Sequence, residues 1–140
     1  MPSIFTRIIA GEIPGRFVWK DQTCVGLVDI NPLAPGHCLV IPRDEVDHWL
    51  DLDDDTADHC HRVAREIGRA QMRVFKPVRI GLIVAGYEVP HTHLHVIPTR
   101  SMADFDFSRA DRSPDPAVLD DAADRLRDHL RAQGHSEADV

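Results

Sequence analysis

Three histidines at alternate positions, His91, His93 and His95, are the residues of this chain best suited to chemistry. Val96 and Ile97 follow them, so the stretch 91–98 predicts a β-strand. Side chains alternate between the two faces of a strand, which places the three imidazoles on one face and the intervening apolar side chains on the other. Neighbouring histidines then have Cα atoms about 6.5 to 7 Å apart. Such a row can act on a phosphate, a metal ion or a proton.

Four interpretations of this row are open from the residues alone. The histidines could be a surface feature of an edge strand, or they could hold a metal ion with help from Glu88 and His37. They could carry out covalent phosphoryl or nucleotidyl transfer, in which a neutral imidazole attacks phosphorus and a neighbouring ring donates a proton. Lastly, they could bind phosphate without turnover. Imidazole titrates near pH 6.5, so adjacent rings can divide acid and base roles without a metal.

The elements that position the row follow from turn residues and hydrophobic periodicity. Ser3 is a candidate N-cap, and the two prolines and the glycine at 31–36 interrupt regular structure. The elements predicted before residue 43 are a short helix at 4–9, a hairpin of strands at 16–20 and 23–29, a turn at 31–36 and a third strand at 37–42.

The second part of the chain predicts a long helix that begins at 53–56 and ends near Lys76-Pro77. The β-branched run 78–85 predicts a largely buried strand that precedes the histidine strand. An irregular connection at 104–116, a helix near 116–132 and loose residues from 133 to 140 complete the chain. The sum is an α+β fold, with an antiparallel sheet of about five strands, one long helix and shorter flanking helices.

Composition excludes several classes of function. The 140 residues predict a single domain, and 43 % apolar with 28 % charged residues describe an ordinary soluble globular protein. A formal charge of −7 without a basic run argues against nucleic-acid or membrane partners. Three widely spaced cysteines and the lack of an apolar leader or membrane span favour the cytoplasm.

His59, Cys60 and His61 have the residue types of a metal cluster, but adjacent side chains on a helix point in different directions. We therefore interpret these three residues as a solvated helix face. We interpret His48, His129 and His135 as surface residues.

Three ordered blocks of sequence resemble the histidine triad (HIT) family of nucleotide hydrolases and transferases. The block 86–98 resembles the family signature, 3–14 its N-terminal segment, and 29–42 its nucleoside-binding strand-turn-strand. The resemblance covers a motif-bearing core of about residues 3–100, and implies a HIT-like fold. Residues 101–140 match nothing in the family pattern.

The resemblance implies a role for each polar site residue. His93 is the expected nucleophile, which forms a covalent nucleotidyl intermediate, and the backbone carbonyl of His91 holds its second nitrogen. His37 orients the row, His95 contacts the phosphate and the leaving group, and Asp29 accepts hydrogen bonds from the ribose hydroxyls.

The remaining expected site residues line the base and the phosphates. Ile30, Phe5, Ile8 and Leu27 are expected to form an apolar slot for the base, although Phe5 and Ile8 could equally be core residues. Residues Gly86, Tyr87 and Glu88 are expected to lie against the phosphates. Tyr87 and Glu88 depart from the Gln and the Ser or Thr that are common in the family.

The resemblance implies no cofactor. Some members hold zinc with a C-x-x-C segment, but the corresponding positions here are Ser3 and Thr6, so no metal is predicted there. The predicted function is hydrolysis or transfer at the α-phosphate of a purine nucleoside phosphoramidate or a dinucleoside polyphosphate, by a homodimer. The alternatives are a nucleotide-binding regulatory protein with little turnover and a metal-dependent hydrolase.

Overall fold

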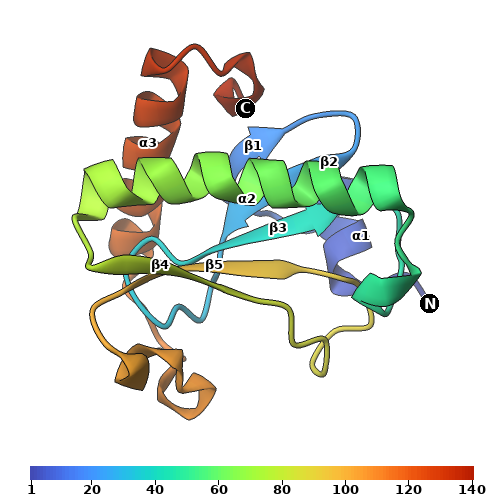
Figure 1. The fold of residues 1–140 in the computed structure, drawn as a ribbon, viewed down its shortest axis with the longest axis horizontal. Helices are drawn as coiled ribbons and strands as arrows, with labels where there is room; N and C mark the ends of the chain where they lie inside the picture. The colour runs from blue at the N-terminus through green and yellow to red at the C-terminus, as the bar shows by residue number, and fades with distance from the viewer.

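The structure, a computed structural model, describes all residues 1–140 and contains one five-stranded antiparallel sheet (Figure 1). Its strands lie in the order β1-β2-β3-β5-β4. The strands are β1 (Phe17–Lys20), β2 (Cys24–Val28), β3 (Cys38–Pro42), β4 (Arg79–Ile83) and β5 (Leu94–Thr99), and the α-helices are α1 (Ile4–Ile9), α2 (Asp54–Phe75) and α3 (Pro116–Ala132). This arrangement confirms the predicted α+β class with one long and two shorter α-helices.

The helix ends confirm Ser3 as the cap predicted for the first helix, and carboxylates cap the two longer helices. Ser3 Oγ accepts a hydrogen bond from the backbone N–H of Thr6 and caps α1. Asp53 caps α2 through the N–H of Thr56, and Asp115 caps α3 through the N–H of Ala117. Each of these side chains satisfies an N–H group that the first helical turn leaves without a partner.

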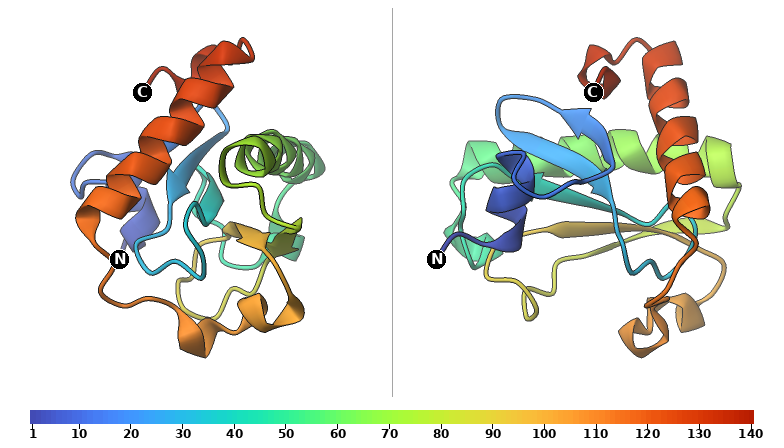
Figure 2. Two further views of the ribbon diagram at one scale, coloured as in Figure 1. Left: turned by 90° about the vertical axis from the view of Figure 1, so that its left-hand side faces the viewer. Right: turned by 180° about the vertical axis from the view of Figure 1, so that it is seen from behind.

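The two faces of the sheet carry different neighbours. Helix α2 crosses one face (Figure 1), where Val40 of β3 and Val96 of β5 join Ile67 of α2 in the larger apolar cluster. The view from behind shows the short α1 against the opposite face (Figure 2, right), where Phe5 and Leu39 belong to a smaller cluster. The His95 position pairs with Leu39, so its ring shares the α1 face.

The histidine stretch is partly outside the strand that was predicted for it. Strand β5 begins at Leu94, so His91 and His93 precede its first assigned residue. There Thr92 donates from its backbone N–H and from Oγ1 to the carbonyl oxygen of Val46. The loop after β3 thus positions the beginning of the row.

Strand β4 corrects the prediction of a largely buried strand. It lies at an edge of the sheet and pairs only with β5, and its Leu82 is 45 % exposed. Val78 just before it is 61 % exposed, and Met72 of α2 is 40 % exposed. The apolar side chains of the run 78–85 therefore belong to a surface of β4 that the rest of this chain covers only in part.

The final residues correct an expectation in part, because residues 133–140, expected to be loose, include a turn that packs on the fold although most of their side chains are exposed. The 3-10 turn Ser136–Ala138 lies near β1 and α3, and Ala138 is fully buried. Asp139 pairs with Arg131 at 3.1 Å.

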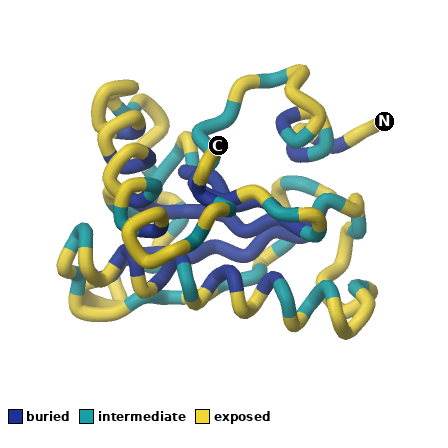
Figure 3. Tube along the Cα trace, turned by 90° about the horizontal axis from the view of Figure 1, so that it is seen from above, coloured by how far each residue is buried: buried dark blue, intermediate teal, exposed yellow.

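The burial colouring shows the buried strands at the centre of the molecule, between helices whose outer surfaces are exposed (Figure 3).

Residues 101–112 form what we call the covering segment. It holds the 3-10 turns Met102–Phe105 and Phe107–Arg109, of which the first begins before and the second lies within the connection 104–116 that was expected to be irregular. The backbone N–H of Asp111 donates to Pro32 O at 3.0 Å, which fixes the segment beside the turn after β2 (Figure 2). Separately, none of the helices combines the length and the apolar character that a membrane crossing requires.

Candidate active site

His93 is held through a single ring nitrogen. Its Nδ1 lies 2.7 Å from the backbone carbonyl oxygen of His91. A carbonyl oxygen can only accept, so Nδ1 carries the proton and Nε2 keeps a lone pair. The ring is 5 % exposed, and its edge packs on Phe5 at a centroid distance of 4.9 Å. The backbone itself therefore prepares this ring as a base or a nucleophile.

His91 is fixed on both sides, and its partners come from distant parts of the chain. Its Nε2 donates to Pro42 O at 2.7 Å, so its Nδ1 must be an acceptor. Ser3 Oγ lies 2.7 Å from that Nδ1 and donates to it. His91 is fully buried, so this pair of hydrogen bonds fixes the ring and the attached carbonyl that holds His93.

Glu45 completes this support from the loop after β3. Its Oε1 accepts from the backbone N–H of Ser3 at 2.6 Å and from Thr6 Oγ1 at 2.7 Å. These hydrogen bonds, that of the Ser3 backbone first, hold the pKa of Glu45 below its usual value. The N-terminal segment is therefore tied to the loop that leads into the histidine row.

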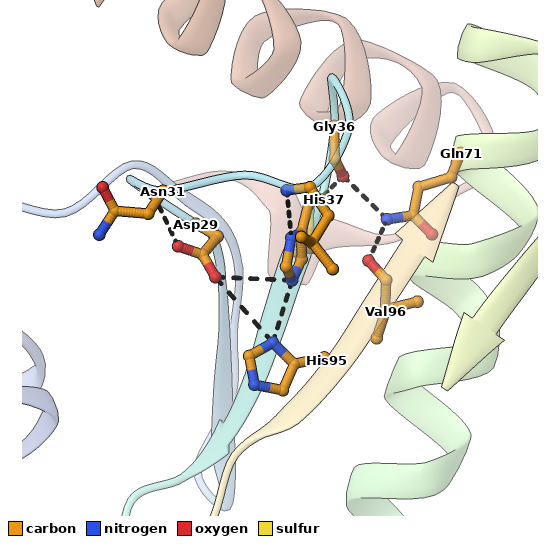
Figure 4. A network of polar contacts seen from close by, with 9 residues as sticks. Asp29, Asn31, Gly36, His37, Gln71, His95 and Val96 are labelled. Carbon is orange, nitrogen blue, oxygen red and sulfur yellow. Dashed lines mark hydrogen bonds and ion pairs between the residues drawn. The ribbon is translucent and has the colours of Figure 1, made fainter. Parts of the chain in front are cut away.

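A second chain of hydrogen bonds fixes His95 (Figure 4). The backbone N–H of Leu33 donates to His37 Nδ1 at 3.0 Å, so neutral His37 carries its proton on Nε2. That nitrogen lies 3.0 Å from His95 Nδ1 and donates to it. Neutral His95 consequently carries its own proton on Nε2. His93 and His95 thus present opposite functions at Nε2, one a lone pair and the other an N–H donor.

Burial lowers the pKa of each of these rings. Desolvation, followed by repulsion from His95 and His93, lowers the pKa of His37 to about 3. Desolvation, followed by repulsion from His93, lowers the pKa of His95 to about 4. For His93 desolvation again lowers the pKa, against the opposing effect of its hydrogen bond to His91. All three are neutral at pH 7, as the assigned tautomers require.

Asp29 lies beside the His37–His95 pair (Figure 4). Its Oδ1 accepts from the N–H of Asn31 at 2.8 Å, and its Oδ2 lies 3.5 Å from His37 Nε2. Burial raises its pKa to about 6, and the charge of Glu88 adds to this effect. The carboxylate is available to accept further hydrogen bonds through Oδ2.

The four residues expected to line the base are unequally placed. Phe5, Ile8 and Leu27 are buried together in the smaller apolar cluster, whereas Ile30 is 60 % exposed. Phe5 also contacts the histidine row through His93 and His91. The structure therefore brings three of them together beside the row and leaves Ile30 directed toward solvent.

The segment expected at the phosphates is open. Tyr87 is 96 % exposed, and Gly86 adopts φ +80° with free space where a Cβ would be. Glu88 is exposed, but its charge raises the pKa of both Asp29 and His93. Glu88 is therefore near the row, whereas the Tyr87 side chain has no buried contact.

Two residues at the row were missed by the sequence analysis. Phe107 of the covering segment packs edge-on against His95, with ring centroids 5.0 Å apart. Gln71 of α2 donates from Nε2 to Gly36 O and Val96 O, which ties the residue before His37 to β5 (Figure 4). A polar Gln within the apolar stripe of a helix was a usable signal, whereas nothing in the sequence indicated Phe107.

Two groups of polar side chains in and near the site differ in their suitability for a metal ion. Ligand atoms of Asp29, His37 and His95 lie within 4.8 Å of one another, so this group could hold an ion. At the N-terminus, the hydroxyls of Ser3 and Thr6 are engaged with Glu45 and His91. Hydroxyls are not the thiolate or imidazole ligands that structural zinc prefers, so this cluster does not fit a zinc site.

Comparisons with known proteins agree on one family. The model of the HIT domain matches residues 10–102. An uncharacterized HIT-like protein of Borreliella burgdorferi is 35 % identical over 116 residues, which are 78 % of this chain and 84 % of that protein. The crystal structure of a HIT-like protein involved in cell-cycle regulation from Bartonella henselae superimposes with a TM-score of 0.79 at 28 % identity. The match covers 91 % of this chain and 96 % of that one. A zinc-bound histidine triad protein of Mycobacterium smegmatis gives a TM-score of 0.81 at 26 % identity, with 96 % of each chain covered.

The fold and the row of buried imidazoles define a histidine triad protein. The chain belongs to the HIT family, because the family model covers more than half of it and the relatives match over most of their length.

Proposed function

We propose that this protein is a nucleotidyl hydrolase or transferase that acts on the α-phosphate of a nucleoside phosphoramidate or dinucleoside polyphosphate. His93 Nε2 attacks the α-phosphorus and forms a P–N bond, while the bond from phosphorus to the bridging nitrogen or oxygen breaks. As that bond breaks, the leaving atom accepts a hydrogen bond from His95 Nε2–H and takes a proton from solvent water. A water molecule then attacks the phosphorus, which breaks the P–N bond to His93, returns a proton to solvent, and releases a nucleoside monophosphate and free His93.

One observation supports this proposal above the others: His93 Nδ1 donates to the His91 carbonyl oxygen at 2.7 Å. A neutral ring with its lone pair fixed on Nε2 needs no metal and no further base before attack. Its lowered pKa keeps it unprotonated at neutral pH. The opposite tautomer of His95 supplies an N–H group that can donate a hydrogen bond to the leaving atom, and the lowered pKa of this ring keeps it in that neutral form at pH 7.

The nucleoside part of the substrate is proposed from the surroundings of the row. Asp29 offers Oδ2 to the two ribose hydroxyls, a contact that a simple phosphate ester cannot make. Phe5, Ile8 and Leu27 supply an apolar surface for a purine base, and Ile30 from its exposed position would close over it. Gly86 leaves the backbone open to phosphate oxygens.

The decisive experiment is trapping of the covalent intermediate. Adenosine phosphoramidate and a dinucleoside polyphosphate are mixed with the protein, quenched without acid, and analysed by mass spectrometry for a nucleotidyl adduct on the peptide that contains His93. His93→Ala is expected to lose the adduct and about 10³-fold or more of kcat. His61→Ala, a substitution of an exposed helix residue, serves as the matched control. Full turnover by His93→Ala would refute the mechanism.

Binding and chelation experiments on the same protein distinguish two alternative functions. A regulatory protein with little turnover would bind a nucleoside monophosphate in an Asp29-dependent manner and form no adduct. A metal-dependent hydrolase would use the Asp29, His37 and His95 group and lose activity with a chelator. We expect activity to survive chelation.

We further propose a homodimer through β4 and α2. The β4 edge has unpaired backbone groups, and exposed Leu82 and Met72 flank it. An apolar groove of about 310 Å³ lies between the strand and the helix, lined by Gly68, Met72, Ile80 and Leu82 among others. A second copy with the same edge would cover this surface and pair the strand.

A further inference from the structure

A cluster of metal-ligating side chains lies away from the histidine row, where the β1–β2 hairpin meets the first half of α2. Asp21 of the hairpin turn is at its centre. Its Oδ1 accepts from the backbone N–H groups of Thr23 and Cys24, both at 2.8 Å, which orients the carboxylate. Its Oδ2 accepts from Trp19 Nε1 at 2.8 Å and lies 2.7 Å from His59 Nε2.

Two thiols lie below this carboxylate. Cys24 Sγ is 3.8 Å from Asp21 Oδ2, and the neighbouring Cys60 thiol is the main cause that raises the pKa of Cys24. Both cysteines are fully buried and unpaired by a disulfide. His59 and Cys60, adjacent on α2, therefore approach the same hairpin turn, which corrects the expectation that they diverge.

We propose that Asp21, Cys24 and His59, together with Cys60, form a second site that binds a divalent ion of the zinc class. The ligand atoms of the first three lie within 4.8 Å of one another. Ligands at about 2.0 to 2.3 Å from a tetrahedral zinc ion are separated by about 3.3 to 3.8 Å. Cys24 Sγ and Asp21 Oδ2 already have this spacing at 3.8 Å, and the Asp21–His59 pair would widen from 2.7 Å as the ion replaces their hydrogen bond. Thiolate, imidazole and carboxylate are the ligand types that zinc prefers.

The charges around the cluster suit such an ion. Although burial alone would raise it, the hydrogen bonds from Trp19, Cys24, His59 and Thr23 lower the pKa of Asp21 to about 2, so the carboxylate is ionised. Two thiolates, this carboxylate and a divalent ion together carry a net charge of −1. The guanidinium of Arg43, whose Nε donates to the backbone carbonyl oxygen of Asp21 at 2.6 Å, lies close enough to offset that charge.

The ion would enter from the His59 side. The side chains of His59 and Asp21 are 37 % and 17 % exposed, whereas the thiols are enclosed. Binding exchanges the protons of both thiols for the metal, so affinity is expected to rise with pH. The ion would connect the hairpin to α2 and stabilise the folded state in proportion to its occupancy.

The experiment uses Co²⁺ and Zn²⁺ with the full-length, metal-stripped protein. Co²⁺ bound by thiolates gives an intense sulfur-to-metal charge-transfer absorption, and titration in the Trp49→Phe background follows Trp19 fluorescence alone. We expect one ion per chain, the charge-transfer band, and quenching of Trp19. His59→Ala and the polar His59→Asn, whose amide is too short to replace Nε2, should weaken binding at least about tenfold. The matched control, His61→Ala, changes the exposed neighbour of Cys60 and should bind like the wild type.

The result that overturns the proposal is equally defined. Absence of the thiolate band, or unchanged affinity in both His59 variants, excludes this site. Loss of the ion in His95→Ala with retention in His59→Ala would place the metal at the histidine row instead. Cys24→Ser provides a second check, because it leaves Cys60 as the single thiolate and should weaken both the band and the affinity at an unchanged fold measured by circular dichroism.

Discussion

Ser3 Oγ lies 2.7 Å from His91 Nδ1, although 88 positions separate the two residues. The backbone carbonyl of the same His91 accepts from His93 Nδ1. The Ser3 hydroxyl is therefore linked to the proposed nucleophile, His93, through a single intervening residue, His91. It contacts no substrate in the proposed mechanism, so it is a positioning residue.

Ser3→Ala is expected to lower kcat by about 10-fold to 100-fold and to leave KM nearly unchanged, because His91 and its carbonyl lose their anchor. The substitution also removes the cap of α1, which costs about 1 kcal/mol of the free energy of unfolding. Asp53→Ala, which removes the cap of α2, is the control for that loss. Equal kinetic effects of the two variants, measured with urea denaturation alongside, would reduce Ser3 to a structural role.

The pH dependence of the reaction should be governed by Asp29. Its raised pKa, about 6, means that the carboxylate is ionised only above this pH. The pKa of His95 is lowered to about 4, so that ring stays neutral as the pH falls from 7 to 5, and burial also lowers the pKa of His93 from its ordinary value. We therefore expect kcat/KM to fall below about pH 6 through a rise in KM. Asp29→Asn should bind the nucleotide weakly and show no such inflection, and a wild-type profile that is flat to pH 5 would contradict the assignment.

Phe107→Ala tests the covering segment. Removing an edge-on aromatic pair costs about 0.5 to 1.5 kcal/mol of stability, and it admits water to His95. Since desolvation is the main cause of the lowered pKa of His95, that pKa should rise toward its ordinary value, which NMR titration of the ring can measure. Phe107→Leu should restore most of the shift, since it restores the apolar cover. An unchanged titration of His95 in the alanine variant would show that Phe107 does not exclude water.

The oligomeric state tests the β4 surface. We expect a dimer in analytical ultracentrifugation, and Leu82→Glu should give a monomer because a carboxylate would be buried at the contact. Val118→Glu changes a residue of similar exposure, 49 % against 45 %, on α3, and should leave the dimer intact. A wild-type monomer, or dissociation by both variants, would exclude this interface.

Much of the fold and part of the site could be predicted because the signals are local. The Asp115-Pro116 start and the Gly134 stop bracket α3, and the alternation of residues after His91 placed the imidazoles opposite the apolar side chains. Local patterns do not report distant partners. The contacts of His91 with Ser3 and of His95 with Phe107 arise only when the chain is folded.

The errors have physical reasons as well. The β-branched run 78–85 indicates that the strand favours burial, but hydrophobicity does not say whether its own chain or a second copy supplies the cover. His59 was assigned to solvent because its helix neighbours diverge, yet the hairpin turn reaches across to it. The last residues are polar in sequence, and Ala138 is buried because the chain turns back toward β1.

Gly81 of β4 lies beneath the ring of Phe105, and a Cβ placed there would come within 2.1 Å of that ring. Phe105 begins the stretch that carries Phe107 to His95. An edge strand commonly tolerates substitution. Here, however, a methyl group added at Gly81 would displace Phe105, and with it Phe107 from its contact with His95 on the neighbouring strand. Sensitivity of the chemistry to substitution thus extends to a position that has no functional group of its own.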